Sequence, residues 1–335
     1  MVKADAYGLG MAGVALALAR AGCTNFFVAT LGEGTELRAL LAEAIIYVLD
    51  GLLEGTAPVY RQLGLRPVLN SAEEIKEWGA FSQVARAKLP AAIHIDSGMN
   101  RLGLSAAEVG SVASAMNPRG AFDLALVMSH LACADEPDHP KNEAQRKTFD
   151  ALRAKLPKAP ASLANSAGIL LGSAYHYDLV RPGIALYGGR TCRMGDNPFA
   201  PVVHLAGRIL QVRDVEAGET VGYGATRTLK RPSRIAILAV GYADGFFRAL
   251  SVSDGREGPH VYLGLHPAPV LGRVSMDLIT VDVTDVPPEL ARRGAWVELI
   301  GNHVTAHELA VHASTIDYEV LTNLGTRAVR RYIGG

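Results

Sequence analysis

The stretch NFFVATLGEGTELRALLAEAIIYVL, residues 25–49, holds the pattern that decides the fold. Two short runs rich in β-branched and aromatic residues, Asn25–Thr30 and Ile45–Leu49, flank a segment with helical spacing, Gly34–Leu41. This alternation predicts a strand, a crossover helix and a second, parallel strand. The same unit recurs along the chain to about residue 190, which places this part among α/β proteins.

Eight strand candidates follow this pattern: Val2–Ala6, Asn25–Thr30, Ile45–Leu49, Arg66–Asn70, Ala91–Asp96, Leu124–His130, Ala161–Asn165 and Leu179–Tyr187. The helices expected between them include Gly10–Ala21, Gly34–Leu41, Ala72–Ala85, Ser105–Met116 and Asn142–Lys155. Ser71 and Ser105, each followed three residues later by Glu, have the spacing of helix N-caps. Eight alternations favour a (β/α)8 TIM-type barrel over an open doubly wound sheet. The loose glycine spacing at residues 7–13 is a weak dinucleotide signal.

Beyond about residue 200 the pattern becomes mainly β. Strand-like runs separated by Gly, Pro and Asp turns lie at Val202–Val215, Thr220–Tyr223, Arg234–Val240, His260–Leu263, Ala268–Val274, Leu278–Val283 and Trp296–Ile300. Short helices are expected near Ala306–Val311 and Tyr318–Asn323. The turn-rich segment Met194–Pro201 marks the boundary, so we predict a barrel over residues 1–198 and a smaller β domain over residues 199–335.

Composition narrows the class of protein. Lys+Arg and Asp+Glu both number 33 in the 335 residues, so no general basic surface for nucleic acid or an anionic membrane is expected. Three scattered cysteines argue against a disulfide framework or a zinc site. The apolar runs Met11–Ala21 and Ile235–Val240 are too short to span a bilayer, and the N-terminus lacks the apolar core of a secretory leader. We therefore expect a cytoplasmic enzyme without a metal.

Polar residues lie on the predicted strands of the barrel or directly after them, and such folds carry their active sites at the strand ends. They are Lys3, Asp5, Asp96 with Arg101, His130, Asn165 with Ser166, and Arg181. A lysine in a desolvated pocket can lose its proton and act as a nucleophile, whereas an edge lysine simply reaches solvent. Ser166 at a helix start and Gly183 near the last strand lie where barrels often bind phosphate, although an N-cap serine and a turn glycine would explain them equally.

A series of motifs carries a resemblance that runs from residue 2 to about residue 331. They are residues 2–8 (VKADAYG), 94–103 (HIDSGMNRLG), 129–132 (SHLA), 164–167 (ANSA), 180–188 (VRPGIALYG), 222–226 (GYGAT), 241–245 (GYADG), 272–277 (GRVSMD) and 315–319 (TIDYE). In this order the motifs resemble the alanine racemase family, pyridoxal-phosphate enzymes with a (β/α)8 barrel. The resemblance implies interconversion of L- and D-alanine, supply of D-alanine for peptidoglycan, and a head-to-tail homodimer.

The resemblance also implies roles for individual residues. Lys3 would bind the cofactor covalently and act as the base on one face of the substrate α-carbon. Tyr223, from the partner subunit, would act on the other face. Both pKa values would have to be lowered by desolvation or cationic neighbours for this chemistry. His130 and Tyr242 would polarise Tyr223.

The remaining implied roles concern binding. Arg181 would face the pyridine nitrogen and, because it keeps its proton, leave that nitrogen unprotonated. Arg101 would hold the cofactor's phenolic oxygen and the substrate carboxylate, and Met276 of the partner would bind that carboxylate through its backbone N–H. The residues expected around the cofactor and its phosphate are Tyr7, His130, Asn165, Ser166, Gly183, Ile184 and Tyr318, with His94 and Asp277 in support.

Three features depart from the family pattern. His94 stands where many members have a lysine whose carbamate positions the active-site arginine, so we hypothesise that a bound anion such as chloride, or a neighbour's hydrogen bond, restrains Arg101. Leu9 and Ser162 replace histidines, which would change rate more than reaction type. Only two residues precede Lys3, and we expect reduced stability and low activity from a start so close to it.

Three alternatives stay open. A broader amino-acid racemase, acting for instance on serine, would use the same chemistry, and sequence does not settle a preference between such small side chains. A pyridoxal-phosphate carrier without turnover would share the barrel, but the β domain with Tyr223 argues against it. A metal-dependent barrel hydrolase would use residues without a recognised ligand spacing, namely His94, Asp96, His130, Asp135 and His139.

Overall fold

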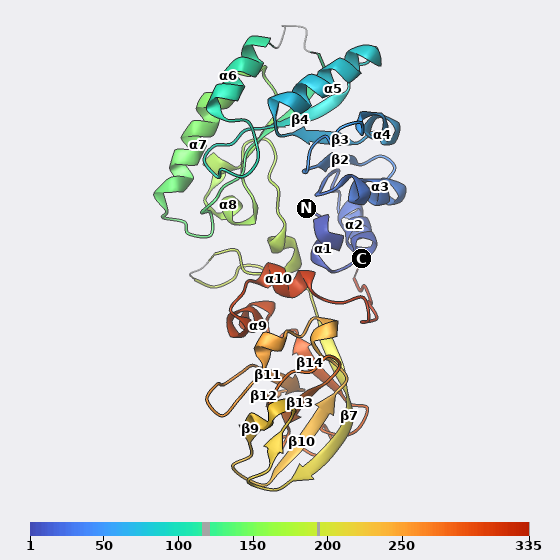
Figure 1. Ribbon diagram of the computed structural model, residues 1–335, viewed down its shortest axis with the longest axis vertical. Helices are drawn as coiled ribbons and strands as arrows, with labels where there is room; N and C mark the ends of the chain where they lie inside the picture. The colour runs from blue at the N-terminus through green and yellow to red at the C-terminus, as the bar shows by residue number, and fades with distance from the viewer. Residues whose placement is uncertain (116–120, 193–194, 335) are drawn as a thin grey trace.

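The computed structural model describes residues 1–115, 121–192 and 195–334 (Figure 1). Two modules follow one another along the chain: a parallel sheet with its helices, and a closed β-barrel. Helices α9 (Ala306–Ala313) and α10 (Asp317–Thr322) lie between them in Figure 1. The last helix also contacts α1 (Lys3–Tyr7), so the end of the chain returns to its beginning.

The N-terminal module is built on six parallel strands that pair in chain order. They are β1 (Asn25–Val28), β2 (Ile45–Val48), β3 (Arg66–Leu69), β4 (Pro90–His94), β5 (Asp123–Met128) and β6 (Ala161–Ser162). Helix α2 (Met11–Arg20) precedes β1, and the helices that connect or follow the strands are α3 (Leu31–Leu40), α4 (Ala57–Leu63), α5 (Ala72–Val84), α6 (Ala106–Ala115), α7 (Pro140–Arg153) and α8 (Ser166–Leu170). The sheet forms a half-barrel, which confirms the predicted barrel-type α/β class.

The capping signals read from the sequence are confirmed. The Ser71 hydroxyl accepts a hydrogen bond from Glu74 N, and Ser105 exchanges hydrogen bonds with Glu108 at the start of α6. These bonds satisfy N–H groups that a helix start leaves without partners. Met116, the expected end of α6, lies outside the described residues, as does Met194 at the predicted boundary.

The prediction of a strand at Val2–Ala6 is wrong. Val2 N donates to Phe27 O, as the first barrel strand would, but the chain then forms the short helix α1. Ala4, Asp5, Ala6 and Tyr7 all have φ between 52° and 57°, which makes α1 a left-handed turn. This conformation costs roughly 1–2 kcal/mol per residue, so tertiary contacts must stabilise it.

The prediction of a strand at Leu179–Tyr187 is also wrong. A single parallel bridge joins Arg181 to Asn165, and the chain then forms the 3-10 helix η2 (Ile184–Tyr187). The intervening Pro182 has no N–H to donate and a fixed φ, so the ladder ends there. The chain nevertheless delivers Arg181 to the end of β6.

The C-terminal module is a closed barrel with strand order β10-β13-β12-β11-β14-β7. Its strands are β7 (Leu205–Val215), β10 (Ser233–Leu238), β11 (His260–Leu263), β12 (His266–Leu271), β13 (Ile279–Asp282) and β14 (Trp296–Ile300), with β8 (Thr220–Val221) and β9 (Arg227–Thr228) forming a small hairpin. Short 3-10 turns are η1 (Ser173–Tyr175), η3 (Tyr223–Ala225), η4 (Tyr242–Asp244) and η5 (Arg248–Leu250). The mainly β character predicted for this part is confirmed.

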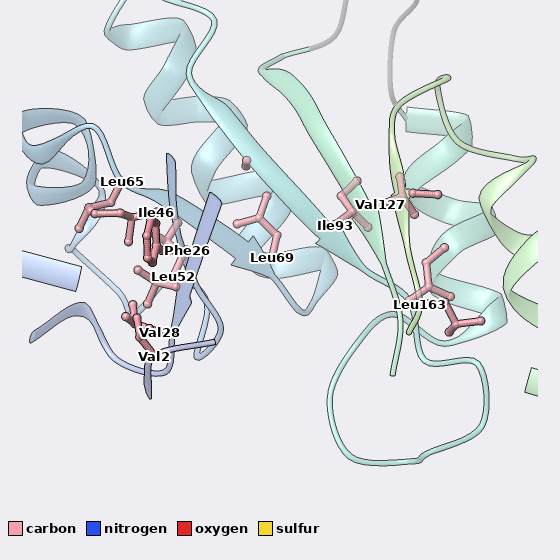
Figure 2. Packing of buried hydrophobic residues seen from close by; sticks show 14 of the residues in the cluster. Val2, Phe26, Val28, Ile46, Leu52, Leu65, Leu69, Ile93, Val127 and Leu163 are labelled. Atoms are coloured by element: carbon pink, nitrogen blue, oxygen red, sulfur yellow. The ribbon is translucent and has the colours of Figure 1, made fainter. Parts of the chain in front are cut away.

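Each module has its own hydrophobic core. Figure 2 shows Val2 beside Val28 at one end of the N-terminal sheet, and Ile93, Val127 and Leu163 at the other. All five are at most 2% exposed. Burying each such side chain contributes about 1.5–3 kcal/mol, which fixes the strand ends that carry the polar residues described next.

Candidate active site

A cavity of about 600 Å³ lies at the carboxyl ends of the parallel strands. Residues that follow β1, β2, β4, β5 and β6 line it, because parallel strands end at the same edge of a sheet. Eleven residues singled out from the sequence meet there: Lys3, Tyr7, His94, Arg101, His130, Asn165, Ser166, Arg181, Gly183, Ile184 and Tyr318. Segments more than 300 residues apart in sequence therefore share one cavity, as Lys3 and Tyr318 do.

Charge in the cavity is unbalanced. Lys3, Arg101 and Arg181 line it, against one carboxylate, Asp50. Among the described residues none forms a hydrogen bond or ion pair with the side chain of Lys3 or of Arg101. The cavity thus presents two uncommitted cations and suits an anionic ligand.

Arg181 is the most constrained of these cations. It is 3% exposed, and its guanidinium donates to Ser162 Oγ and Ser129 O, both at 2.5 Å, and to Leu163 O at 3.3 Å. Burial lowers its pKa to about 10, which still leaves the group charged at neutral pH. Its guanidinium also lies 3.3 Å from His130 Nδ1, and burial followed by the charge of Arg181 lowers the His130 pKa to about 3.

His94 has a defined protonation state. Asn70 Nδ2 donates to the carbonyls of Leu49 (3.1 Å) and Val68 (2.9 Å), so its Oδ1 is the atom that faces His94 Nδ1 at 2.8 Å. An amide oxygen only accepts, and therefore Nδ1 carries the proton. Burial, followed by the charge of Arg181, lowers the His94 pKa to about 4, so the ring is neutral with Nε2 free to accept.

The loops after β6 form a close-packed cradle. Asn165 caps α8 by accepting from Gly168 N, and Ser166 Oγ accepts from Gly183 N at 2.8 Å. A Cβ atom at Gly183 would lie 2.2 Å from the Tyr7 hydroxyl, so only glycine fits there. The Tyr7 ring packs 5.9 Å from Tyr318, and burial raises the pKa of both phenols, that of Tyr318 to about 12.

The other candidate residues do not reach this cavity. Tyr223, Tyr242 and Met276 lie in the C-terminal module and are 72%, 40% and 53% exposed. Tyr242 N donates to Ser275 O, and Asp277 pairs with Arg327 at 2.7 Å. Within one chain these residues therefore remain separate from Lys3, on the surface of the β module.

Sequence reasoning missed several contributors. Asp50 lines the cavity directly after β2, where the rule of strand ends would have found it. Asn70 was missed because it acts through the neighbouring ring of His94. Glu33 was missed because it acts by accepting hydrogen bonds from backbone N–H groups, such as that of Ala4. Ser162, noted as a departure from the family, donates to Leu179 O and accepts from Arg181, whereas Leu9 O accepts from the Tyr332 hydroxyl.

The metal-hydrolase alternative gains no support. Within residues 1–115, 121–192 and 195–334, no group of three or more His, Cys, Asp or Glu side chains is arranged to hold a metal ion. Asp96 instead accepts backbone N–H bonds from Gly98, Met99 and Asn100, and His139 caps α7. None of the helices in this described part is long and apolar enough to cross a membrane.

Two family descriptions match the chain: "Alanine racemase, N-terminal domain" over residues 1–191 and "Alanine racemase, C-terminal domain" over residues 202–332. The chain belongs to the alanine racemase family. It is 50% identical to an alanine racemase of Methylobacterium nodulans over 100% of this chain and 89% of that protein. It is also 48% identical to a catabolic alanine racemase of Mesorhizobium japonicum, over 100% of this chain and 86% of that one.

Solved structures agree with this family assignment. The alanine racemase of Bartonella henselae, with covalently bound pyridoxal phosphate, superposes with a TM-score of 0.93 at 40% identity and covers 99% of this chain and 91% of that one. The biosynthetic alanine racemase of Pseudomonas aeruginosa gives a TM-score of 0.88 at 37% identity, with the same coverage of both chains. The family resemblance stated from the motifs is thereby confirmed.

Proposed function

We propose that this protein is a pyridoxal-phosphate-dependent alanine racemase that interconverts L- and D-alanine. The observation that carries the proposal is the meeting of Lys3, Arg101 and Arg181 in one cavity at the carboxyl ends of the sheet. We further propose two domains, residues 1–198 and 199–335, and a cytoplasmic role in supplying D-alanine for peptidoglycan.

The residues of the cavity fit this cofactor. An uncommitted amine at Lys3 suits its aldehyde, and the excess of positive charge suits its phosphate and a substrate carboxylate. When bound, pyridoxal phosphate draws electron density from the α-carbon of an attached amino acid and so acidifies its α-hydrogen. Tyr7, Asn165, Ser166, Gly183, Ile184 and Tyr318 would surround the phosphate.

Arg181 would face the pyridine nitrogen. Because a guanidinium only donates and its pKa of about 10 keeps it charged, it would not give up a proton there. Its bonds to Ser162 and Ser129 fix its orientation before any ligand binds. Arg101 would bind the phenolic oxygen and the substrate carboxylate, and a bound anion near neutral His94 would restrain it.

Racemisation requires a proton to leave one face of the α-carbon and another to arrive at the opposite face. The Lys3 amine would serve one face. Tyr223, 72% exposed on its own chain, would serve the other face from a second copy. Met276 would add a backbone N–H to the carboxylate, with Tyr242, Asp277 and His130 supporting Tyr223. This arrangement implies a head-to-tail homodimer.

The test is direct. The full chain is incubated with pyridoxal phosphate and L-alanine, and D-alanine is measured with time, with L-serine tested in parallel. We expect a visible absorption band that borohydride removes while labelling Lys3, and equal approach to a racemic mixture from either enantiomer. Cofactor binding without turnover would overturn the proposed activity and favour a carrier protein. A higher rate on serine would overturn the assignment of alanine as substrate.

A further inference from the structure

The glutamate at the start of α3 accepts two hydrogen bonds beyond those of its capping box. Glu33 forms a capping box with Thr30. The Thr30 hydroxyl accepts a hydrogen bond from Glu33 N, and Glu33 Oε2 accepts one from Thr30 N. The same oxygen accepts from Ala29 N at 2.7 Å. The other oxygen, Oε1, accepts from Ala4 N at 2.6 Å, 29 residues earlier in the chain.

Two other capping boxes in the part of the chain that the structure describes lack a contact of this kind. Glu108 accepts only from the N–H and hydroxyl of its own N-cap, Ser105, and Glu308 only from those of Thr305. The bond from Ala4 to Glu33 is therefore additional to helix capping. It joins the first turn of α3 to the residue directly after Lys3.

The position of this bond determines what it controls. Ala4 N belongs to the peptide unit that begins at the Lys3 carbonyl, so fixing it fixes rotation about the Cα–C bond of Lys3. On the other side of Lys3, Val2 N is bonded to Phe27 O in β1. Glu33 is itself bonded to Ala29, directly after β1. The backbone on both sides of Lys3 is therefore held at the end of β1, directly through Val2 and indirectly through Glu33.

The left-handed turn is the reason why Ala4 N needs the hydrogen bond to Glu33. From Ala4 to Tyr7 the chain holds φ values that side-chain-bearing residues rarely adopt, and the first N–H groups of such a turn have no partner within it. The charged carboxylate of Glu33 supplies one to Ala4, and a charge-assisted bond is stronger than one between neutral groups.

We propose that Glu33 is a positioning residue that directs the Lys3 amine into the cavity by holding the peptide unit between Lys3 and Ala4. The inference rests on the proposed function for its consequence, since Lys3 is the group that binds the cofactor. The bond itself is a property of this chain and can be measured without turnover.

The experiment compares Glu33→Gln with two control variants of the full chain, each loaded with pyridoxal phosphate for the exchange measurement and freed of it before the titration. Glu308→Gln removes a carboxylate from an ordinary capping box, and Glu36→Gln removes an exposed carboxylate from the same helix. Mass spectrometry measures amide hydrogen exchange at Ala4. In a second measurement, borohydride traps the cofactor attached to Lys3, and the pyridoxal-phosphate concentration that gives half-maximal attachment is determined.

We expect Ala4 to exchange roughly 10- to 100-fold faster in Glu33→Gln, and half-saturation to need about tenfold more cofactor, with neither quantity changed in the controls. A second variant, Glu33→Asp, keeps the charge and the helix cap but is one methylene too short to reach Ala4, and should show the same two changes. Its kcat should fall while KM for alanine stays near that of the unchanged chain.

Unchanged exchange at Ala4 in both Glu33 variants would overturn the inference, as would equal changes in the controls. Loss of folding in both variants would also overturn it, because Glu33 would then be a general determinant of the fold. Failure of the proposed function is distinguishable: the unchanged chain would not racemise alanine, while the exchange at Ala4 would still report on Glu33.

Discussion

The cavity around Lys3 and the surface around Tyr223 differ in how complete they are. The cavity is formed within one chain, with Arg181 buried and held by four oxygen and nitrogen atoms. Tyr223 is 72% exposed and lies in the other module. Under the proposed function, the first region would bind an anionic cofactor within one chain, whereas the second would take part in catalysis only against the cavity of another chain.

The largest effect should follow removal of the Lys3 amine. Lys3→Ala takes away both the proposed attachment point and one proton-transfer group, so we expect racemisation to fall by about 10⁴-fold or more. D-alanine formation and the visible spectrum measure this. The exposed Lys155→Ala is the matched control and should keep normal activity. If the Lys3 variant kept its activity, the cavity around Lys3 would not be the site of the reaction.

A somewhat smaller loss should follow change at the exposed site. Tyr223→Phe removes only a hydroxyl from a side chain that packs against little of its own chain, so the free energy of unfolding should not change measurably. Racemisation should fall about 10²- to 10⁴-fold, while cofactor attachment stays complete. Absorption spectra and thermal melts give these two readouts. Loss of the cofactor in this variant would show that Tyr223 supports binding and not proton transfer.

Low pH should lower the stability of the N-terminal module, which contains the cavity. The pKa values of His94 and His130 lie at about 4 and about 3, below the ordinary 6.5, because burial opposes their charged forms. The unfolded chain therefore binds more protons below about pH 6.5, and stability falls as pH falls from there towards 4, by about 1–2 kcal/mol per histidine at pH 5.

Thermal melts between pH 7 and pH 5 check this prediction. His94→Gln should lessen the fall, and the exposed His204→Gln should leave it as in the unchanged chain. If His94→Gln melts with the same pH dependence as His204→Gln, the assignment of a neutral, buried His94 is wrong.

The smallest effect is expected on the β module. Asp277→Asn breaks the pair with Arg327, whose partners are 54% and 53% exposed, so stability should change by less than about 1 kcal/mol. If Asp277 supports the surface around Tyr223, the KM for alanine should rise although the melting temperature does not. Arg231→Gln, which breaks a comparable exposed pair with Asp285, is the control. Equal kinetics in the two variants would remove Asp277 from the site.

The sequence predicted most of the fold because strand and helix periods are local signals. The strands from β1 to β6 and the barrel strands were each anticipated within a few residues. The left-handed turn at Ala4–Tyr7 was not, since it depends on bonds to Glu33 and to β1 that no local pattern encodes. Pro182 alone signalled the end of pairing after Arg181.

The candidate site also contains residues that the sequence could predict and residues that it could not. Residues at strand ends, such as His130 and Ser166, could be located from topology. Asn70 could not, because its role is to set the proton position on His94 through two backbone carbonyls. The resemblance already implied that Tyr223 acts from a partner subunit; its 72% exposure, outside the lining of the Lys3 cavity, supports that proposal but could not be read from the sequence.

Hybrid dimers test the central claim most directly. Lys3→Ala and Tyr223→Phe chains are each purified, measured alone, then mixed 1:1 under conditions that allow subunits to exchange. If Tyr223 acts on the partner's cavity, each hybrid contains one site with both groups intact. Half of the dimers are hybrids, so the mixture should recover about one quarter of the activity of the unchanged protein. A mixture as inactive as its two components would contradict the account, because both groups would then serve the same chain.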